Sequence, residues 1–143
     1  MKSKIVLAAT LALVCSASSF ASVEGAARHT AFKKIQHDMR IIGPMVKGQI
    51  AYDKNTLSSA AADLKLISRE PFRHFDSQSS AAGTDAKAAI WSRPDDFAHD
   101  RDHFYAAADA LSVAASSGDL AQVRKSFTPL VQSCKTCHDS FRR

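Results

Sequence analysis

The feature that most constrains this chain is a C-x-x-C-H motif at residues 134–138, close to the end of the sequence. Cys134 and Cys137 are three positions apart and His138 follows Cys134 by four, so a helix would present all three on one face. Two thiols and an adjacent imidazole in this spacing are the attachment signature of c-type haem. The thiols bond covalently to the porphyrin, and the histidine becomes an axial ligand of the iron. The motif therefore predicts a helix that carries haem c on one face.

Three other uses of paired cysteines fit this sequence less well. A thioredoxin-like C-x-x-C follows a strand in an alternating α/β chain, and no segment here has the pattern of a strand. A tetrahedral zinc site takes four ligands, but no second Cys/His pair has a suitable spacing. A disulfide between residues three apart would close too short a loop to stabilise a fold. We therefore interpret the motif as a haem site.

Residues 1–21 have the pattern of a secretory signal peptide. Two lysines precede an apolar segment at 5–14 that is too short to span a bilayer. Small residues at positions 19 and 21 predict cleavage after Ala21, which leaves a mature domain at 22–143. C-type haem on an exported chain predicts a periplasmic protein.

Charge and hydropathy exclude two classes of partner. Loss of the two signal-peptide lysines lowers the formal net charge from +5 to +3, and no Lys/Arg run forms a basic stripe, so nucleic acid is not expected. No later segment is apolar enough to cross a membrane, so membrane insertion is not expected either.

Apolar residues recur every three or four positions in four segments, the spacing of amphipathic helices. These segments are residues 23–47, 55–68, 92–117 and 119–141, and the small polar stretch 76–86 is predicted to be a loop. The expected inner faces include Phe32, Ile35, Met39, Ile42 and Val46, then Leu57, Ala61, Leu64 and Ile67 or Ser68, then Phe97, Phe104, Ala108, Leu111 and Ala115, and finally Leu120, Val123, Phe127 and Leu130.

Caps and prolines mark the ends of these helices. The expected caps are Gly48, Asn55 and Asp119, the last in a capping box with Gln122. Pro44 and Pro129 lie inside helical patterns and should bend them, whereas Pro94 lies in a first turn. Long helices, mostly short links and no β pattern predict an all-α protein, an antiparallel four-helix bundle with haem attached to the C-terminal helix.

The mature chain as a whole resembles the cytochrome c′ family of α-helical c-type cytochromes. The resemblance rests on Arg28 with an apolar residue four positions on, Pro44-Met45-Val46-Lys47-Gly48-Gln49 with Tyr52-Asp53, Ile90-Trp91-Ser92, Gly118-Asp119-Leu120, and C-K-T-C-H-D with Phe141-Arg142. C-x-x-C-H alone fits any c-type cytochrome, but its place behind three helices narrows the choice.

The resemblance implies that Phe32, four residues after Arg28, faces the distal side of the haem. Some low-spin relatives carry a methionine ligand there; phenylalanine has no lone pair, so the iron should be five-coordinate with His138 as its only protein axial ligand. Met39 lies two turns from Phe32, roughly 10 Å along the helix, too far to bind the same iron. The place of Phe32 among the apolar residues of this helix would also fit an ordinary core residue.

The resemblance also implies several residues at the haem edge. These are Arg28, His29, Thr84, Asp85 and Lys87 near the edge or the propionates, and Arg142 on the proximal side. For Arg142 a solvated role at the end of the helix, complementing its dipole, stays open.

The expected function is the binding of small gases, nitric oxide and carbon monoxide, in nitric oxide sequestration or tolerance. Bound dioxygen needs a distal hydrogen-bond donor, which an apolar pocket lacks, so we expect discrimination against it. We do not expect an enzyme, because rapid peroxide cleavage needs a distal base. The alternative is a periplasmic electron carrier with a redox partner. The family resemblance further implies a homodimer through the first two helices, about 27–47 and 57–68.

Overall fold

The computed structural model describes residues 15–76, 81 and 84–143, with side chains from residue 23 onward. Its elements are α1 (Cys15–Val46), α2 (Lys54–Ile67), the 3-10 helix η1 (Glu70–His74), α3 (Ala89–Ser92), α4 (Pro94–Ser117) and α5 (Leu120–Phe141). Residues 1–14 of the predicted signal peptide lie outside the described residues, and the predicted cleavage point after Ala21 falls within α1.

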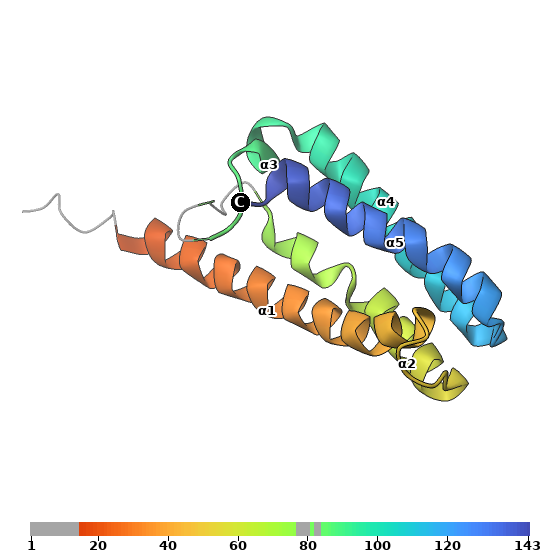
Figure 1. Ribbon diagram of the computed structural model, residues 1–143. Helices are drawn as coiled ribbons and strands as arrows, with labels where there is room; N and C mark the ends of the chain where they lie inside the picture. The colour runs from red at the N-terminus through yellow and green to blue at the C-terminus, as the bar shows by residue number, and fades with distance from the viewer. Residues whose placement is uncertain (1–14, 77–80, 82–83) are drawn as a thin grey trace, which may run out of the picture.

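The four long helices form the predicted all-α bundle (Figure 1). α1 packs on α2, α2 on α4 and α4 on α5, while α5 meets α1 along only a short stretch. The start of α1, the segment before α3 and the end of α5 gather at one end of the bundle. The described residues contain no strand, only an isolated bridge between Ala86 and Arg142. Within the same residues, no helix combines the length and the apolar character needed to cross a membrane.

The cap of α1 is the residue predicted from the sequence, whereas the cap of α2 is a different residue. Gly48 has a φ of 72° and its amide donates to the Met45 carbonyl, so it ends α1 as predicted. Asn55 is not the cap of α2. Asp53 takes that role because its backbone is extended, and its carboxylate accepts a 2.7 Å hydrogen bond from the Thr56 amide.

The ends of α4 and α5 follow the sequence closely. Pro94 is the first residue of α4, and Gly118, with a φ of 79°, ends it. The Asp119 carboxylate caps α5 by accepting hydrogen bonds from the amides of Ala121 and Gln122. The Gln122 side chain donates to the Asp119 carboxylate instead of returning to its backbone amide, so only half of the predicted capping box forms.

The main core lies between all four long helices. Most predicted inner-face residues are buried, while Phe32, Met39, Ile67 and Leu120 are half-buried at its edge. A second, smaller cluster of Ile90, Phe97 and Phe141 lies where α3, α4 and α5 meet. The end of α5 therefore has its own apolar support.

Two short elements were not predicted. η1 follows α2 almost directly and contains the buried Pro71, and α3 is a single turn before α4. Segments of five and four residues are too short to show an apolar period. Both nevertheless bring aromatic side chains to the end of the bundle where the haem motif lies.

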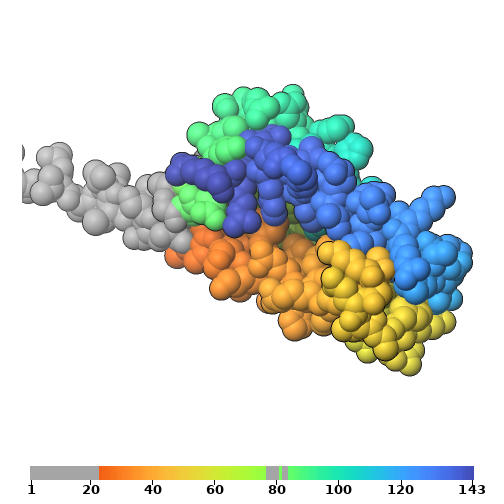
Figure 2. All heavy atoms as spheres, in the orientation of Figure 1, coloured from red at the N-terminus to blue at the C-terminus, as the bar shows by residue number. Residues whose placement is uncertain are grey.

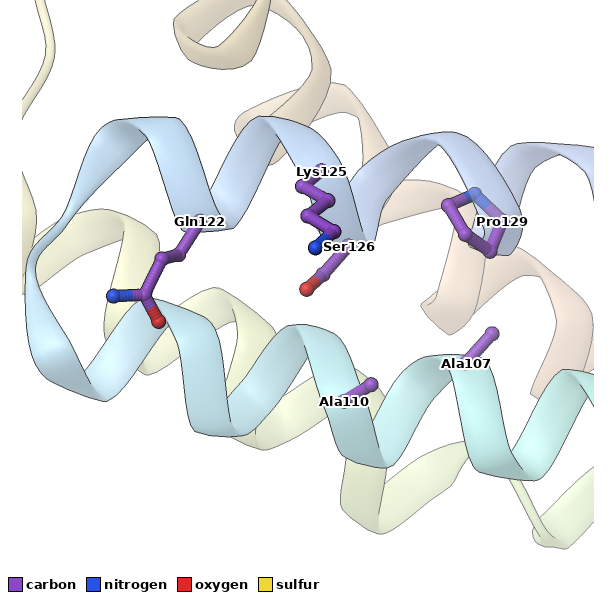
Figure 3. A pocket seen from close by; sticks show the side chains of 6 residues that line it. All are labelled: Ala107, Ala110, Gln122, Lys125, Ser126 and Pro129. Carbon is purple, nitrogen blue, oxygen red and sulfur yellow. The ribbon is translucent and has the colours of Figure 1, made fainter.

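A shallow groove of about 500 Å³ lies between α4 and α5 next to Pro129, which lies inside the continuous helix α5 (Figure 3). Its lining residues are Ala107, Ala110, Gln122, Lys125, Ser126 and Pro129. None of the predicted site residues lines this groove. It lies along the first half of α5, whereas the C-x-x-C-H motif lies in the second half.

Candidate haem site

The C-x-x-C-H motif lies in the last two turns of α5. Cys134 packs against the main core and Cys137 against the second cluster, and neither thiol is paired in a disulfide. Burial raises the pKa of Cys134, and burial with the nearby Asp100 carboxylate raises the pKa of Cys137 to about 11. Both thiols are therefore neutral and face apolar surroundings.

His138 lies at the solvent-facing edge of the same helix face. Partial burial, together with the positive charge of Arg142 one turn on, lowers the pKa of its imidazole. The neutral imidazole is the form that binds a metal. The three motif residues thus have the arrangement and the protonation states that haem attachment needs.

The segment before α3 lies against the end of α5 (Figure 2). We call the hydrogen bonds that join the two the clasp. The Lys87 amide donates to the Phe141 carbonyl and the Arg143 amide to the Asp85 carbonyl, each at 2.8 Å. The Arg142 guanidinium donates to the Asp85 carboxylate at 3.1 Å. The Lys87 ammonium donates to the Asp139 carbonyl at 2.8 Å. Three predicted site residues, Asp85, Lys87 and Arg142, are thus brought together beside the motif.

Thr84 connects the same segment to α1. Its hydroxyl donates to the Ala81 carbonyl and accepts from the Ala86 amide. Its methyl group lies against Gly25 of α1, where a Cβ atom would come within 2.7 Å of it. The segment therefore joins the end of α5 to the first turns of α1.

Arg28 is the most deeply buried charged side chain among the predicted site residues, with 3% of its surface exposed. Its guanidinium donates to the His74 carbonyl at 2.9 Å and lies over the rings of Phe75 and Trp91, 4.6 and 5.9 Å from their centres. Burial lowers the pKa of Arg28, while Glu24 and Asp76 act in the opposite direction. A buried cation at this end of the bundle has the chemistry to hold a propionate.

Phe32 lies one turn after Arg28 and belongs to an aromatic cluster at this end of the bundle. Its ring meets that of Phe72 edge-on, with centres 5.9 Å apart. Phe72 lies in η1 and contacts four further rings at 5.4 to 6.1 Å. We define the aromatic cluster as Phe32, Phe72, Phe75, Trp91, Phe97, Phe104, Tyr105 and Phe141.

The sequence did not predict every residue of this region. His29 is exposed beside Arg28, and its role at the haem edge stays a prediction. Phe72 and Phe75 were not predicted as site residues, and Trp91 was noted only for the family resemblance. The available signal was the close spacing of aromatic residues after the second helix, P-F-R-H-F at 71–75.

Comparison with known proteins decides the family. The sequence model of cytochrome C' matches residues 24–142, nearly the whole chain after the predicted signal peptide. The chain belongs to the cytochrome c′ family. A cytochrome c′ of Pararhodospirillum photometricum is 34% identical over 115 residues, which is 80% of this chain and 92% of that protein.

Solved structures of cytochrome c′ agree in fold. Cytochrome c′ of Shewanella frigidimarina has a TM-score of 0.82 and 31% identity, covering 85% of this chain and 95% of that one. A leucine-to-alanine variant of cytochrome c′ from Alcaligenes xylosoxidans, solved as its nitric oxide complex, has a TM-score of 0.80 and 31% identity over 85% and 94% of the two chains.

Cytochrome c′ proteins bind haem c covalently, and the residues of this chain fit that cofactor. Cys134 and Cys137 present thiols on one helix face toward apolar clusters, and His138 supplies a neutral imidazole beside them. Arg28 offers a buried cation, and the aromatic cluster offers apolar ring surface. Haem would supply the iron chemistry, and these are the side chains that would attach and surround it.

Proposed function

We propose that this cytochrome c′ binds nitric oxide and carbon monoxide at a five-coordinate haem and discriminates against dioxygen, in nitric oxide sequestration or tolerance. The observation that carries the proposal is the position of Phe32, one turn after Arg28 and held at the edge of Phe72. Its side chain has no atom that can bind iron. The nitric oxide complex of the Alcaligenes relative supports this choice of ligand.

The chemistry of the aromatic cluster supports the discrimination. Bound dioxygen gains from a hydrogen-bond donor, whereas nitric oxide and carbon monoxide depend on one less. The rings of Phe32, Phe72 and Phe75 have no donor. The indole N–H of Trp91 already donates to the Asp76 carbonyl at 2.9 Å. These four rings therefore offer dioxygen no hydrogen bond, and the Tyr105 hydroxyl, on a ring that contacts Phe72, is a separate donor of the cluster.

Absorption spectra of the purified ferrous holoprotein test this proposal. We expect a high-spin spectrum without added ligand, clear spectral changes with nitric oxide and with carbon monoxide, and no stable complex in air. A sharp low-spin α-band in the unliganded ferrous protein contradicts five-coordination. A stable dioxygen complex contradicts the discrimination.

Electron transfer is the second candidate, favoured by the exposed outer side of the motif. Lys135 and Thr136 are exposed on α5, so one side of the motif faces solvent. Electron self-exchange measured by nuclear magnetic resonance line broadening separates the two functions. A five-coordinate iron that reorganises strongly predicts slow exchange, and fast exchange favours the carrier.

Export and self-association complete the proposal. The segment 1–21 has the features of a signal peptide for the periplasm. A homodimer through α1 and α2 is supported by Leu66, which is 75% exposed on α2, and by a shallow groove of about 320 Å³ that Leu66 helps to line. Light scattering of the mature holoprotein tests this. Leu66→Glu should convert a dimer to a monomer, and an unchanged mass contradicts an interface there.

A further inference from the structure

We propose that His99 and His103 on α4 form a binding site for a divalent transition-metal ion, separate from the haem ligand His138. The two residues are one helical turn apart and both are exposed. Their Nε2 atoms lie 3.2 Å apart and their ring centres 4.5 Å apart. The two nitrogens thus converge on one point at the surface of the helix.

The separation of these nitrogens matches the distance between two ligands of one metal ion. Zinc–imidazole bonds of about 2.0–2.1 Å, at an angle between about 90° and 110°, place the two nitrogens about 2.9–3.4 Å apart. The observed 3.2 Å lies inside this range. An ion can therefore enter with little movement of either ring, and the shared helix keeps the second ligand close once the first has bound.

The charges around the pair favour a cation. A carboxylate oxygen of Asp100 lies 3.6 Å from Nδ1 of His99, which favours a proton on that nitrogen and leaves Nε2 to bind the metal. Asp102 lies near both histidines, and its carboxylate pairs with Arg101 at 2.9 Å. Asp102 thereby neutralises the positive charge of Arg101 next to the histidine pair.

The site is open and suits particular metals. Within the described residues, no group of three or more His, Cys, Asp or Glu side chains forms a metal cluster, so water must fill the remaining positions. Imidazole ligands suit zinc, copper and nickel, and Cu²⁺ binds such sites most strongly. Asp100, the residue after His99, also acts on the pKa of Cys137 on the haem-bearing helix.

A titration of the ferric holoprotein with Cu²⁺ tests the site, with calorimetry for affinity and electron paramagnetic resonance for the ligand atoms. We expect one stoichiometric site with imidazole nitrogen coupling. His99→Gln and His103→Gln should each weaken it by at least about tenfold. His37→Gln, which removes an exposed histidine of α1, should leave it unchanged.

Three outcomes overturn the proposal. They are the absence of a stoichiometric site in the unaltered protein, full affinity in either single variant, or an equal loss in His37→Gln. If the two imidazoles only hydrogen-bond to each other, the first outcome follows. Because both residues are exposed, the variants should fold, and an unchanged haem absorption spectrum verifies this.

Discussion

The ring of Phe32 on α1 meets the ring of Phe72 in η1 at an interplanar angle of 77°. Phe72 is in turn surrounded by the ring of Phe75, which directly follows η1, and by three rings of α4. Phe32 therefore cannot turn aside without losing an edge-to-face contact and disturbing its neighbour. A gas molecule that must displace this ring meets resistance from the whole aromatic cluster.

Shortening Phe32 should accelerate nitric oxide binding. An edge-to-face pair contributes about 0.5–1.5 kcal/mol, so its loss should raise the association rate by up to about tenfold. We expect Phe32→Ala to bind fastest in stopped-flow measurements, with Phe32→Leu between it and the unaltered protein. Phe127→Leu, a change in the main core, should lower stability but leave the rate unchanged. Equal association rates in Phe32→Ala, Phe32→Leu and the unaltered protein would contradict a lid.

Replacing Arg28 with lysine should lower the stability of the folded protein. Its planar guanidinium donates to the His74 carbonyl while lying over Phe75 and Trp91, and an ammonium cannot keep both contacts. We expect Arg28→Lys to lower the free energy of unfolding by about 1–3 kcal/mol, measured by urea denaturation of the holoprotein. The exposed Lys33→Arg on the same helix is the matched control and should have little effect.

Gly25→Ala should destabilise the protein, although alanine favours a helix over glycine. The new Cβ would lie 2.7 Å from the Thr84 methyl group, and the Thr84 hydroxyl is held by two hydrogen bonds, which resists rotation of the side chain. Thr84→Ser removes the methyl group and keeps the hydroxyl. Thermal melting of the double variant should therefore recover the loss. No recovery would indicate a different cause.

Asp53 should stabilise α2 in a pH-dependent manner. Hydrogen bonds from the Thr56 amide and hydroxyl lower the pKa of its carboxylate in the folded protein. Its contribution is therefore complete above the ordinary pKa of aspartate and is lost as the pH falls through the lowered value. Asp53→Ala should reduce the melting temperature by a few degrees at about pH 7, and the difference should shrink toward about pH 3.

Asp53→Asn is the control for this cap. Its amide oxygen still accepts a hydrogen bond but carries no charge, so the difference in melting temperature between Asp53→Asn and Asp53→Ala should vary little with pH. If the difference between Asp53→Ala and the unaltered protein stays constant across the range, the charge of the cap has no role.

The regular parts of this fold could be predicted because their residues repeat. Leu57, Ala61 and Leu64 recur at helical spacing and are all buried, and Gly118 has the positive φ that ends α4. The motif at 134–138 has a fixed spacing, so the haem-bearing helix could also be placed. Local patterns of this kind need no knowledge of distant residues.

The surroundings of the haem site depend on long-range contacts that no local pattern records. Phe72 gains its importance from rings on α1 and α4, and a segment of five residues shows no period. Asp85 and Lys87 were expected at the haem edge, but their visible partners are Arg143, Arg142, Asp139 and Phe141 at the end of α5. Only the folded structure shows that the segment before α3 lies against the end of α5.

The clasp has a consequence for the iron ligand itself. His138 lies in the last turn of α5, where helices ordinarily fray because their final carbonyls have no partner within the helix. Here Lys87, 52 residues earlier in the sequence, donates to the Asp139 carbonyl, and its own amide donates to that of Phe141. The last turn of α5 is thereby hydrogen-bonded to the segment before α3. The order of the turn that would present the iron ligand thus depends on a segment outside this helix.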